Sequence, residues 1–482
     1  MANVSGEPPF SYLFYDAVTG ALQGMLPLSA PKLSSILNAP GTWNATVDLT
    51  DPKVQAMNPI GVTTPGRTIM CVDYNGALIY GGLVSTRKWS HKTRKLTLGG
   101  KEIWEWFSLR NQWSDYQTVP TQPTGASMQY WTAATWDASM IAAQVVSDAL
   151  APPITLTGTT DGTTGVITGI STPGIMYGMP VSGTGVPIGS VVVAISAASV
   201  MISQATTVAA TSALTFGLSQ NNLLGGLQLL VNGAAPSTWA VTPPSSSANW
   251  ISPTYPWTSL STVDSIVTQL SRLGLNIGCD FGVDVAYASG PGSVPVATIN
   301  LSYPRRGRTV ANNNLVLDLS SSAVSDYEFP EDATGAGSTQ FQMGGTAGGL
   351  ANAYANPYPT NQGYPLTEQV GSASNIVSSS VLLELSQAAS AFASYPLVAA
   401  TVTMDAFGGN PVFGDFIVGD DIQILLPALD QDGQVFDPRF PNGLNEEWRI
   451  TQYDLTVNDE GIVEMMLTLQ LPPQIIAVGP AI

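Results

Sequence analysis

Short runs of β-branched and aromatic residues recur along this chain and are interrupted by Gly, Pro and Asn-Gly. Such runs are typical of β-strands, and the 47 Gly and 35 Pro supply the tight turns that strands need between them. A single hydrophobic core stops growing at roughly 250 to 300 residues, whereas this chain has 482. We therefore predict a mainly β fold class with minor α content, divided into several domains.

Residues 1–118 carry the pattern of one β-domain, either a barrel or a sandwich. Between two of its expected strands lies Asn75-Gly76, which supplies the positive φ angles of a tight hairpin turn. Apolar residues within Ile103–Leu109 recur at helical spacing, so a short helix is expected to close the domain before a Pro- and Gln-rich linker. The expected strands are Tyr12–Tyr15, Trp43–Leu49, Thr68–Asp73, Ala77–Thr86 and Lys95–Leu98.

Residues 119–153 and 219–330 are assigned to a middle α+β domain. In its second helix the apolar residues recur at i, i+3, i+4 and i+7, which places them on one face. The elements predicted here are helices at Asp137–Leu150 and Thr262–Leu273 and strands at Leu275–Tyr287 and Val296–Tyr303.

Residues 154–218 break sharply from both flanks in composition. Short Val, Ile and Thr runs alternate there with Gly-rich turns, and no charged residue occurs between Asp161 and Asp264. A segment of this kind presents hydroxyl and backbone groups to water rather than ions. We predict a small β-module inserted into the middle domain.

The C-terminal third begins with a Gly- and Asn-rich stretch that has almost no strand signal. Residues 331–364 are therefore expected to form an extended arm or a loop held by its neighbours. Residues 365–482 return to strand patterns and are assigned to a second outer β-domain. Its expected strands are Leu397–Met404, Asp421–Leu426, Trp448–Val457 and Ile462–Leu471, the last pair joined by a hairpin at Asn458–Gly461.

The formal charge of −18 opposes general affinity for nucleic acids and anionic membranes, which bind through Lys and Arg. It suits a conduit through which DNA slides, although acidity also simply maintains solubility. Cys71 and Cys279 lie too far apart to suggest a metal site or a disulfide framework. The start of the chain has no signal-peptide pattern, and the most apolar stretch, Val186–Ile202, is too short and too interrupted to predict a membrane span.

Catalytic patterns are sparse. His91 is the single histidine and lies among cationic neighbours, which disfavour the imidazolium that a Ser-His-Asp mechanism forms. The carboxylate pairs Asp420-Asp421 and Glu446-Glu447 are expected to be solvated, and neighbours on a strand point to opposite faces. Asp430–Gly433 resembles the start of a calcium loop but lacks the closing Glu, so a turn is favoured over calcium binding. We expect no enzyme, no cofactor and no metal.

Two clusters concentrate the positive charge of the chain. Nucleic-acid binding is disfavoured there by the overall charge and by the scarcity of aromatic stacking partners. Two interpretations stay open: the clusters meet acidic surfaces on neighbouring subunits, or they are solvated loops. The candidate interface residues are Arg87, Lys88, Lys92, Arg94, Lys95, Arg305, Arg306 and Arg308.

Sequence motifs at both ends resemble the minor tail or tail-tip hub proteins of long-tailed bacteriophages that infect actinobacteria. The N-terminal motifs are GGLVST and LTLGGKEIWEWFSLR, and the C-terminal ones are GDFIVGDDIQILLP and EEWRITQYDLTVNDEGIVEMMLTL. The resemblance covers roughly the outer thirds of the chain and implies two tube-like β-barrels, at about 1–118 and 365–482. VSGTGVPIGSVVVAIS and ISQATTVAATSALTF resemble small β-modules inserted in many phage virion proteins.

This resemblance implies a structural protein of the virion tail tip, made in the host cytoplasm, that forms a homotrimeric ring with six barrels around a DNA-permitting channel. The implied partners are a distal tail or tail-tube protein, the tape measure protein and distal fibre or tip proteins. One alternative is a carbohydrate-binding receptor-recognition protein, and a less favoured one is a cell-wall hydrolase. The aromatic residues that suggest glycan contact are Trp239, Trp250, Tyr255 and Trp257.

Overall fold

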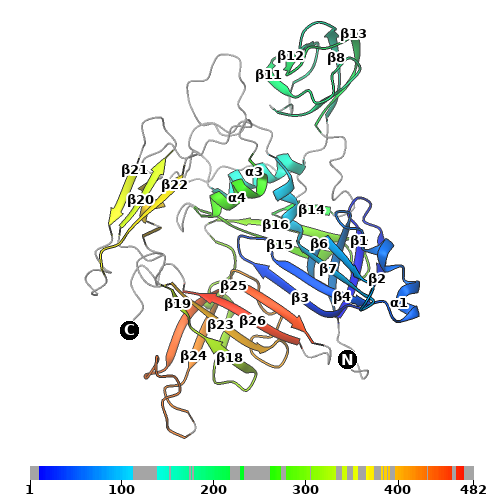
Figure 1. The fold of residues 1–482 in the computed structure, drawn as a ribbon. Helices are drawn as coiled ribbons and strands as arrows, with labels where there is room; N and C mark the ends of the chain where they lie inside the picture. Colours follow the sequence, from blue (N-terminus) through cyan, green and yellow to red (C-terminus); the bar gives the residue numbers. More distant parts are fainter. Residues whose placement is uncertain are drawn as a thin grey trace.

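A 14-stranded sheet dominates the computed structural model of the chain (Figure 1). Three smaller sheets and a few helices accompany it, so the predicted mainly β fold class is confirmed. The structure describes residues 10–111, 138–150, 154–217, 228–232, 261–272, 278–332, 339–344, 351–355, 365–373, 382–390, 397–458 and 463–471, apart from 173, 174, 176, 177, 304, 384, 388 and 431.

Seven antiparallel strands from residues 10–102 form the first half of the large sheet, in the order β3-β4-β7-β6-β5-β1-β2. The predicted hairpin at Asn75-Gly76 is confirmed: it joins β5 to β6, with φ of 52° and 84° at the two residues. The elements are β1 (Phe10–Asp16), β2 (Leu22–Met25), β3 (Ser29–Ile36), β4 (Thr42–Asp48), α1 (Pro52–Ala56), α2 (Pro59–Val62), β5 (Thr68–Tyr74), β6 (Ala77–Ser90) and β7 (Lys95–Glu102).

Seven strands from residues 316–470 form the second half, and one of them, β25, belongs to both halves. The first part of β25 pairs with β24, and its second part pairs with β26 along one edge and with β3 along the other. Hydrogen bonding therefore joins the two outer groups of strands into one continuous sheet. The strands are β17 (Val316–Asp318), β18 (Val324–Glu328), β19 (Glu331–Asp332), β23 (Leu397–Asp405), β24 (Asp421–Leu426), β25 (Leu444–Val457) and β26 (Val463–Gln470).

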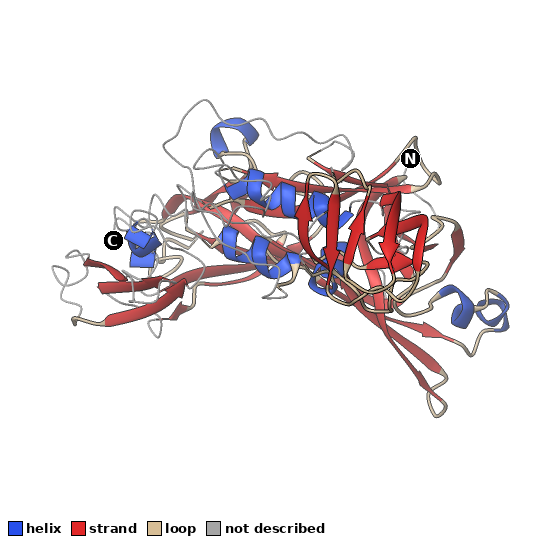
Figure 2. Cartoon of the chain, turned by 90° about the horizontal axis from the view of Figure 1, so that it is seen from above, coloured by secondary structure: helices blue, strands red, loops and turns tan. Residues whose placement is uncertain are grey.

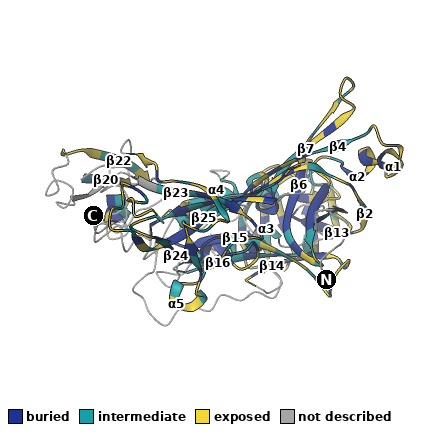
Figure 3. Cartoon of the chain, turned by 90° about the horizontal axis from the view of Figure 1, so that it is seen from below, coloured by how far each residue is buried: buried dark blue, intermediate teal, exposed yellow. Residues whose placement is uncertain are grey.

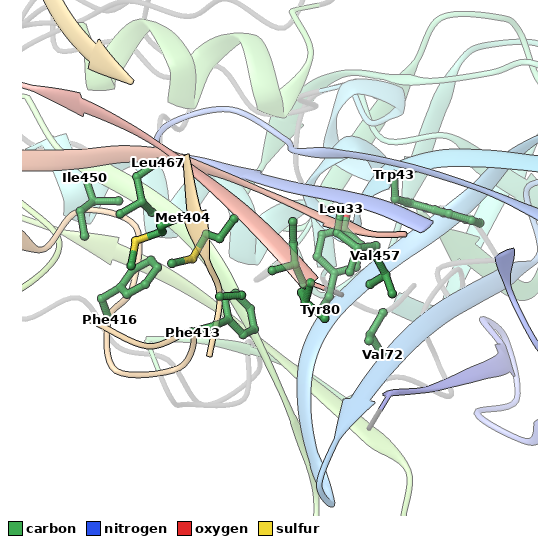
Figure 4. Close-up of a cluster of buried hydrophobic side chains, with 14 of the residues drawn as sticks. Leu33, Trp43, Val72, Tyr80, Met404, Phe413, Phe416, Ile450, Val457 and Leu467 are labelled. Carbon is green, nitrogen blue, oxygen red and sulfur yellow. The ribbon is translucent and has the colours of Figure 1, made fainter. Parts of the chain in front are cut away.

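One hydrophobic core lies against both halves of this sheet (Figure 4). Leu33 and Tyr80 from the first half gather with Val457 from the second, and Met404 and Phe413 extend the same cluster. Because both groups of strands contribute to a single core, neither half completes its apolar packing alone.

Alternate residues of β1 and β5 face two different cores. Phe14 and Met70 belong to the core just described, whereas Leu13 and Cys71 belong to a second core on the opposite side of the sheet. A strand buried on both faces needs apolar residues at successive positions. This explains why these two strands read as nearly unbroken apolar runs instead of alternating.

The middle segment supplies the other side of that second core. Its sheet has the order β14-β16-β15, and α3 and α4 lie side by side over it (labelled in Figure 1; Figure 2 shows the helices from above in blue). The predicted helix after Thr262 is confirmed, and the Thr262 hydroxyl caps it by accepting from the Ser265 backbone N–H. The elements are the 3₁₀ helix η1 (Ile103–Leu109), α3 (Ala138–Leu150), β14 (Gln228–Val231), α4 (Val263–Ser271), β15 (Asp280–Tyr287), β16 (Pro295–Ser302) and α5 (Val310–Asn313).

Residues 154–216 contribute a six-stranded sheet with a hydrophobic core of its own (Figure 1). Its order is β10-β13-β8-β9-β12-β11. The first and last strands pair antiparallel with Ile154 opposite Phe216, so the chain enters and leaves this unit at neighbouring points. The strands are β8 (Ile154–Asp161), β9 (Val166–Thr168), β10 (Val181–Gly183), β11 (Val192–Ser196), β12 (Ser199–Ile202) and β13 (Ala209–Phe216).

The stretch expected to be an extended arm contains strands instead. β20 (Thr339–Gly344) pairs antiparallel with β21 (Ala351–Ala355) and parallel with β22 (Glu368–Ala373). These strands contain few β-branched residues, so the sequence gives little sign of them. Backbone pairing with neighbouring strands, and not local propensity, stabilises them. The expectation of an arm at 331–364 is corrected accordingly.

The boundary expected near residue 330 also shifts. β17 and β18 precede it, yet they pair with β24 and β23 of the second half of the large sheet. The pairing partners lie 73 to 107 residues further along the chain, so local patterns could not reveal this assignment. Within the part of the chain that the structure describes, no helix has the length and apolar character needed to cross a bilayer.

Replacing residues 154–217 with a short Gly/Ser linker should leave a folded remainder, because this unit has a separate core and its ends lie side by side. Far-UV circular dichroism and the cooperativity of thermal unfolding would measure folding of the deletion variant. Aggregation of the remainder would show that the unit contributes to the main cores.

Candidate functional site

A buried carboxylate joins three parts of the chain. Asp280, at the start of β15, is 7% exposed. One of its oxygens accepts from Asn38 Nδ2 at 2.8 Å, and the other accepts from the Arg306 backbone N–H, also at 2.8 Å. The guanidinium of Arg449 pairs with that second oxygen. Asn38 follows β3, Arg306 follows β16 and Arg449 lies on β25, so this group, the Asp280 junction, ties the middle segment to both halves of the large sheet.

Arg306 itself is buried within the Asp280 junction. Its guanidinium crosses Gly282 so closely that a Cβ at this position would lie 1.6 Å from Nη1. The same guanidinium pairs with Asp284. Only glycine therefore leaves room for this arginine on β15.

The arginine cluster assigned to subunit contacts is used inside the chain. Each guanidinium pairs with an aspartate, which for Arg305 and Arg308 lies 116 and 112 residues away. Arg306 is only 7% exposed, so its place as a candidate for subunit contacts is corrected. Asp420 and Asp421, expected to be solvated, are fully buried by these pairs. The sequence shows the cations but not the counter-charges that folding brings to them. The pairs are Arg305–Asp421 at 2.6 Å, Arg308–Asp420 at 2.5 Å and Arg306–Asp284.

Glu102 is a second buried carboxylate near the Asp280 junction. It accepts a 2.8 Å hydrogen bond from the Gly41 backbone N–H. Burial raises the pKa of Glu102 to about 7, although that hydrogen bond and the nearby charge of Arg306 oppose the rise. The end of β7 therefore holds a carboxyl group that is largely protonated in mildly acidic solution.

The first basic cluster lies on the distal part of the β6–β7 hairpin, which projects beside β4 and α1 (Figure 3). Arg87 is used locally, since it donates to the carbonyl oxygens of Ile60 and Thr63 at the end of α2. The remaining cations of this cluster are exposed and, within the described residues, form no ion pair. We call these four residues the basic hairpin: Lys88, Lys92, Arg94 and Lys95.

Strand register shows which charged side chains share one face of the large sheet. Residues opposite one another on paired strands point to the same face. Lys95 lies opposite Asp48 and Ser90, and Lys88 lies opposite Thr97. The same face continues through β4 to Lys32 of β3.

Beyond β3 this face becomes acidic. Asp454 of β25 lies opposite Ser34 of β3, and it is followed outward by Glu464 of β26. β18 forms the edge of the sheet, with Asp326 and Glu328 opposite Thr403 and Thr401 of β23. Both edge carboxylates are exposed, and we call them the acidic edge.

The other predicted site residues do not converge. His91 is exposed at the turn of the β6–β7 hairpin. The Asp430 carboxylate accepts the backbone N–H groups of Asp432 and Gln434, which is the geometry of a turn. Among the described residues, no three His, Cys, Asp or Glu side chains are grouped as metal ligands. The possible glycan contacts lie outside the described residues: Trp239, Trp250, Tyr255 and Trp257.

Replacing Arg449 with Met should lower the free energy of unfolding by about 3–5 kcal/mol, because it leaves the Asp280 carboxylate buried without its cation. Lys101→Met is the matched control. Its ion pair with Glu105 is partly exposed to solvent, so about 1 kcal/mol or less is expected. Urea titration followed by tryptophan fluorescence measures both variants, and equal effects would contradict a special role for the Asp280 junction.

Glu102→Gln should remove part of the pH dependence of stability. Between pH 4.5 and about 7 the folded chain holds a proton on Glu102 that the unfolded chain has lost, so stability falls as pH rises through this range. The variant should therefore unfold at higher temperature than the wild type at pH 8, and its free energy of unfolding should be greater by on the order of 3 kcal/mol at most. Glu464→Gln, on the exposed face, should follow the wild-type profile in the same thermal scans.

No protein-family model matches the sequence, and no curated protein matches it. Solved structures match it along nearly its whole length. The 43 kDa tail protein of prophage MuSo2 from Shewanella oneidensis gives a TM-score of 0.51 at 11% identity, over 97% of this chain and 99% of that one. A tail protein from Neisseria meningitidis gives 0.47 at 10% identity, over 97% and 98% of the two chains. The chain thus shares its overall fold with the Shewanella oneidensis tail protein.

Proposed function

We propose that this chain is a structural component of a bacteriophage tail tip, in which three copies form a ring that continues the tail tube. The observation that carries the proposal is the fold likeness to a prophage tail protein over 97% of one chain and 99% of the other. A match of this extent includes the order and connection of the segments, not one widely shared module.

The division of the large sheet supports a ring of three. Each half contributes seven strands, and β25 joins the halves edge to edge through β3. Three such chains present six sheet halves to a sixfold tube. A single gene product can therefore connect a threefold assembly to a sixfold one. In this proposal the two halves take the place of the two barrels that the resemblance implies.

The charge of the chain suits a channel for DNA. With 34 acidic and 16 basic residues, the ring repels the phosphate backbone and lets DNA pass without binding it. In this proposal the ring contacts the tail-tube or distal tail protein on one side and fibre or tip proteins on the other, with the tape measure protein in its channel. The role is mechanical rather than enzymatic.

Electron cryomicroscopy of intact virions tests the proposal directly. We expect three copies per tail at the tip, with both sheet halves around one channel and the basic hairpins directed toward neighbouring subunits. A different copy number, or basic hairpins that line the channel, would contradict the model.

A further inference from the structure

The face of the large sheet that carries Lys32, Lys95 and Glu464 is divided by charge, outside the part on β1, β5 and β6 that the second core covers. Carboxylates occupy this face on β18, β23, β26 and β25, whereas lysines occupy it on β3, β7 and β6. β4, which lies between β3 and β7, contributes polar residues and one carboxylate, Asp48. The acidic part ends at the acidic edge on β18, and the basic part ends at the basic hairpin.

The acidic edge and the basic hairpin, at the two ends of this pattern, do not neutralise each other within one chain. Six strand-to-strand steps separate β18 from β7 in the sheet order. At about 4.8 Å per step, this corresponds to roughly 29 Å. Salt at physiological concentration screens exposed charges beyond about 8 Å. Each group is therefore free to attract an opposite charge from another molecule.

We propose that the basic hairpin of one copy docks on the acidic edge of the next copy, so that the chains associate head to tail. This inference rests on the proposed ring and names the contact that closes it. A head-to-tail contact uses two different surfaces of each copy and generates a ring when the rotation between copies closes. The charge pattern supplies both surfaces on one chain, at opposite ends of one sheet.

A second copy fits this pattern better than a nucleic acid does. DNA would attract the basic hairpin but would be repelled by the acidic edge, whereas another copy satisfies both. Trp89 lies on the other face of the same hairpin, opposite Leu96, and remains 46% exposed. Tryptophan beside cations is typical of residues that dominate protein–protein contacts.

Charge reversal tests the contact in assembled tails. Full-length variants are supplied to a phage that lacks its own copy, and complete tails are counted by electron microscopy. Lys88→Glu with Lys95→Glu reverses the hairpin, and Asp326→Lys with Glu328→Lys reverses the edge. Each double variant should lower the yield of complete tails by about tenfold or more, and added salt should partly restore the yield.

Combining all four substitutions in one chain is the decisive arm. Each contact then has opposite charges again, so the yield should return to near the wild-type value. Lys53→Glu with Arg272→Glu is the matched control, since it changes net charge as the hairpin variant does but at exposed positions off this face. It should assemble normally.

The outcomes separate this contact from the proposed function. If three copies form the ring and the reversed hairpin assembles at the wild-type level, the head-to-tail contact is wrong while the ring stands. If the wild-type chain forms no tail ring, the proposed function itself fails. Loss in both double variants without recovery in the combined chain would also overturn the contact, because it would reflect damage rather than charge.

Discussion

The Asp280 carboxylate couples three regions that are far apart in the sequence. Its partners follow β3, follow β16 and lie on β25, and the pair with Arg449 spans 169 residues. A buried carboxylate is tolerated only when it is paired and hydrogen-bonded, so none of the three regions can move away without leaving a buried charge unpaired. The relative placement of the two sheet halves thus depends on one polar group as well as on the shared core.

Local patterns in the sequence were sufficient for individual elements. The spacing of Val263, Ile266, Val267 and Leu270 predicts α4, and all four side chains are fully buried. Strand patterns and Asn75-Gly76 likewise predict most of the first half of the large sheet. These signals succeed because period and turn chemistry act between near neighbours.

Long-range pairing was not visible in the same way. The arginines at 305, 306 and 308 look like a free cationic cluster in the sequence, but folding brings an aspartate to each of them. The segregated face could be recognised only from strand register, because its members alternate with buried residues on eight strands. β20 and β21 escaped prediction since their strand conformation depends on pairing and not on β-branched residues.

Scarce positive charge is divided between two uses. Of the 16 Lys and Arg, seven form ion pairs within the described residues, and most of those pairs hold aspartates that are buried. What remains is concentrated on the basic hairpin, far from the acidic part of the same face.

The unit at 154–216 has a different mechanical character, because Ile154 and Phe216 are neighbours. A force that pulls this unit away from the rest of the molecule is shared by two adjacent chain connections. The force therefore acts at one end of the unit and does not shear its strands along their length.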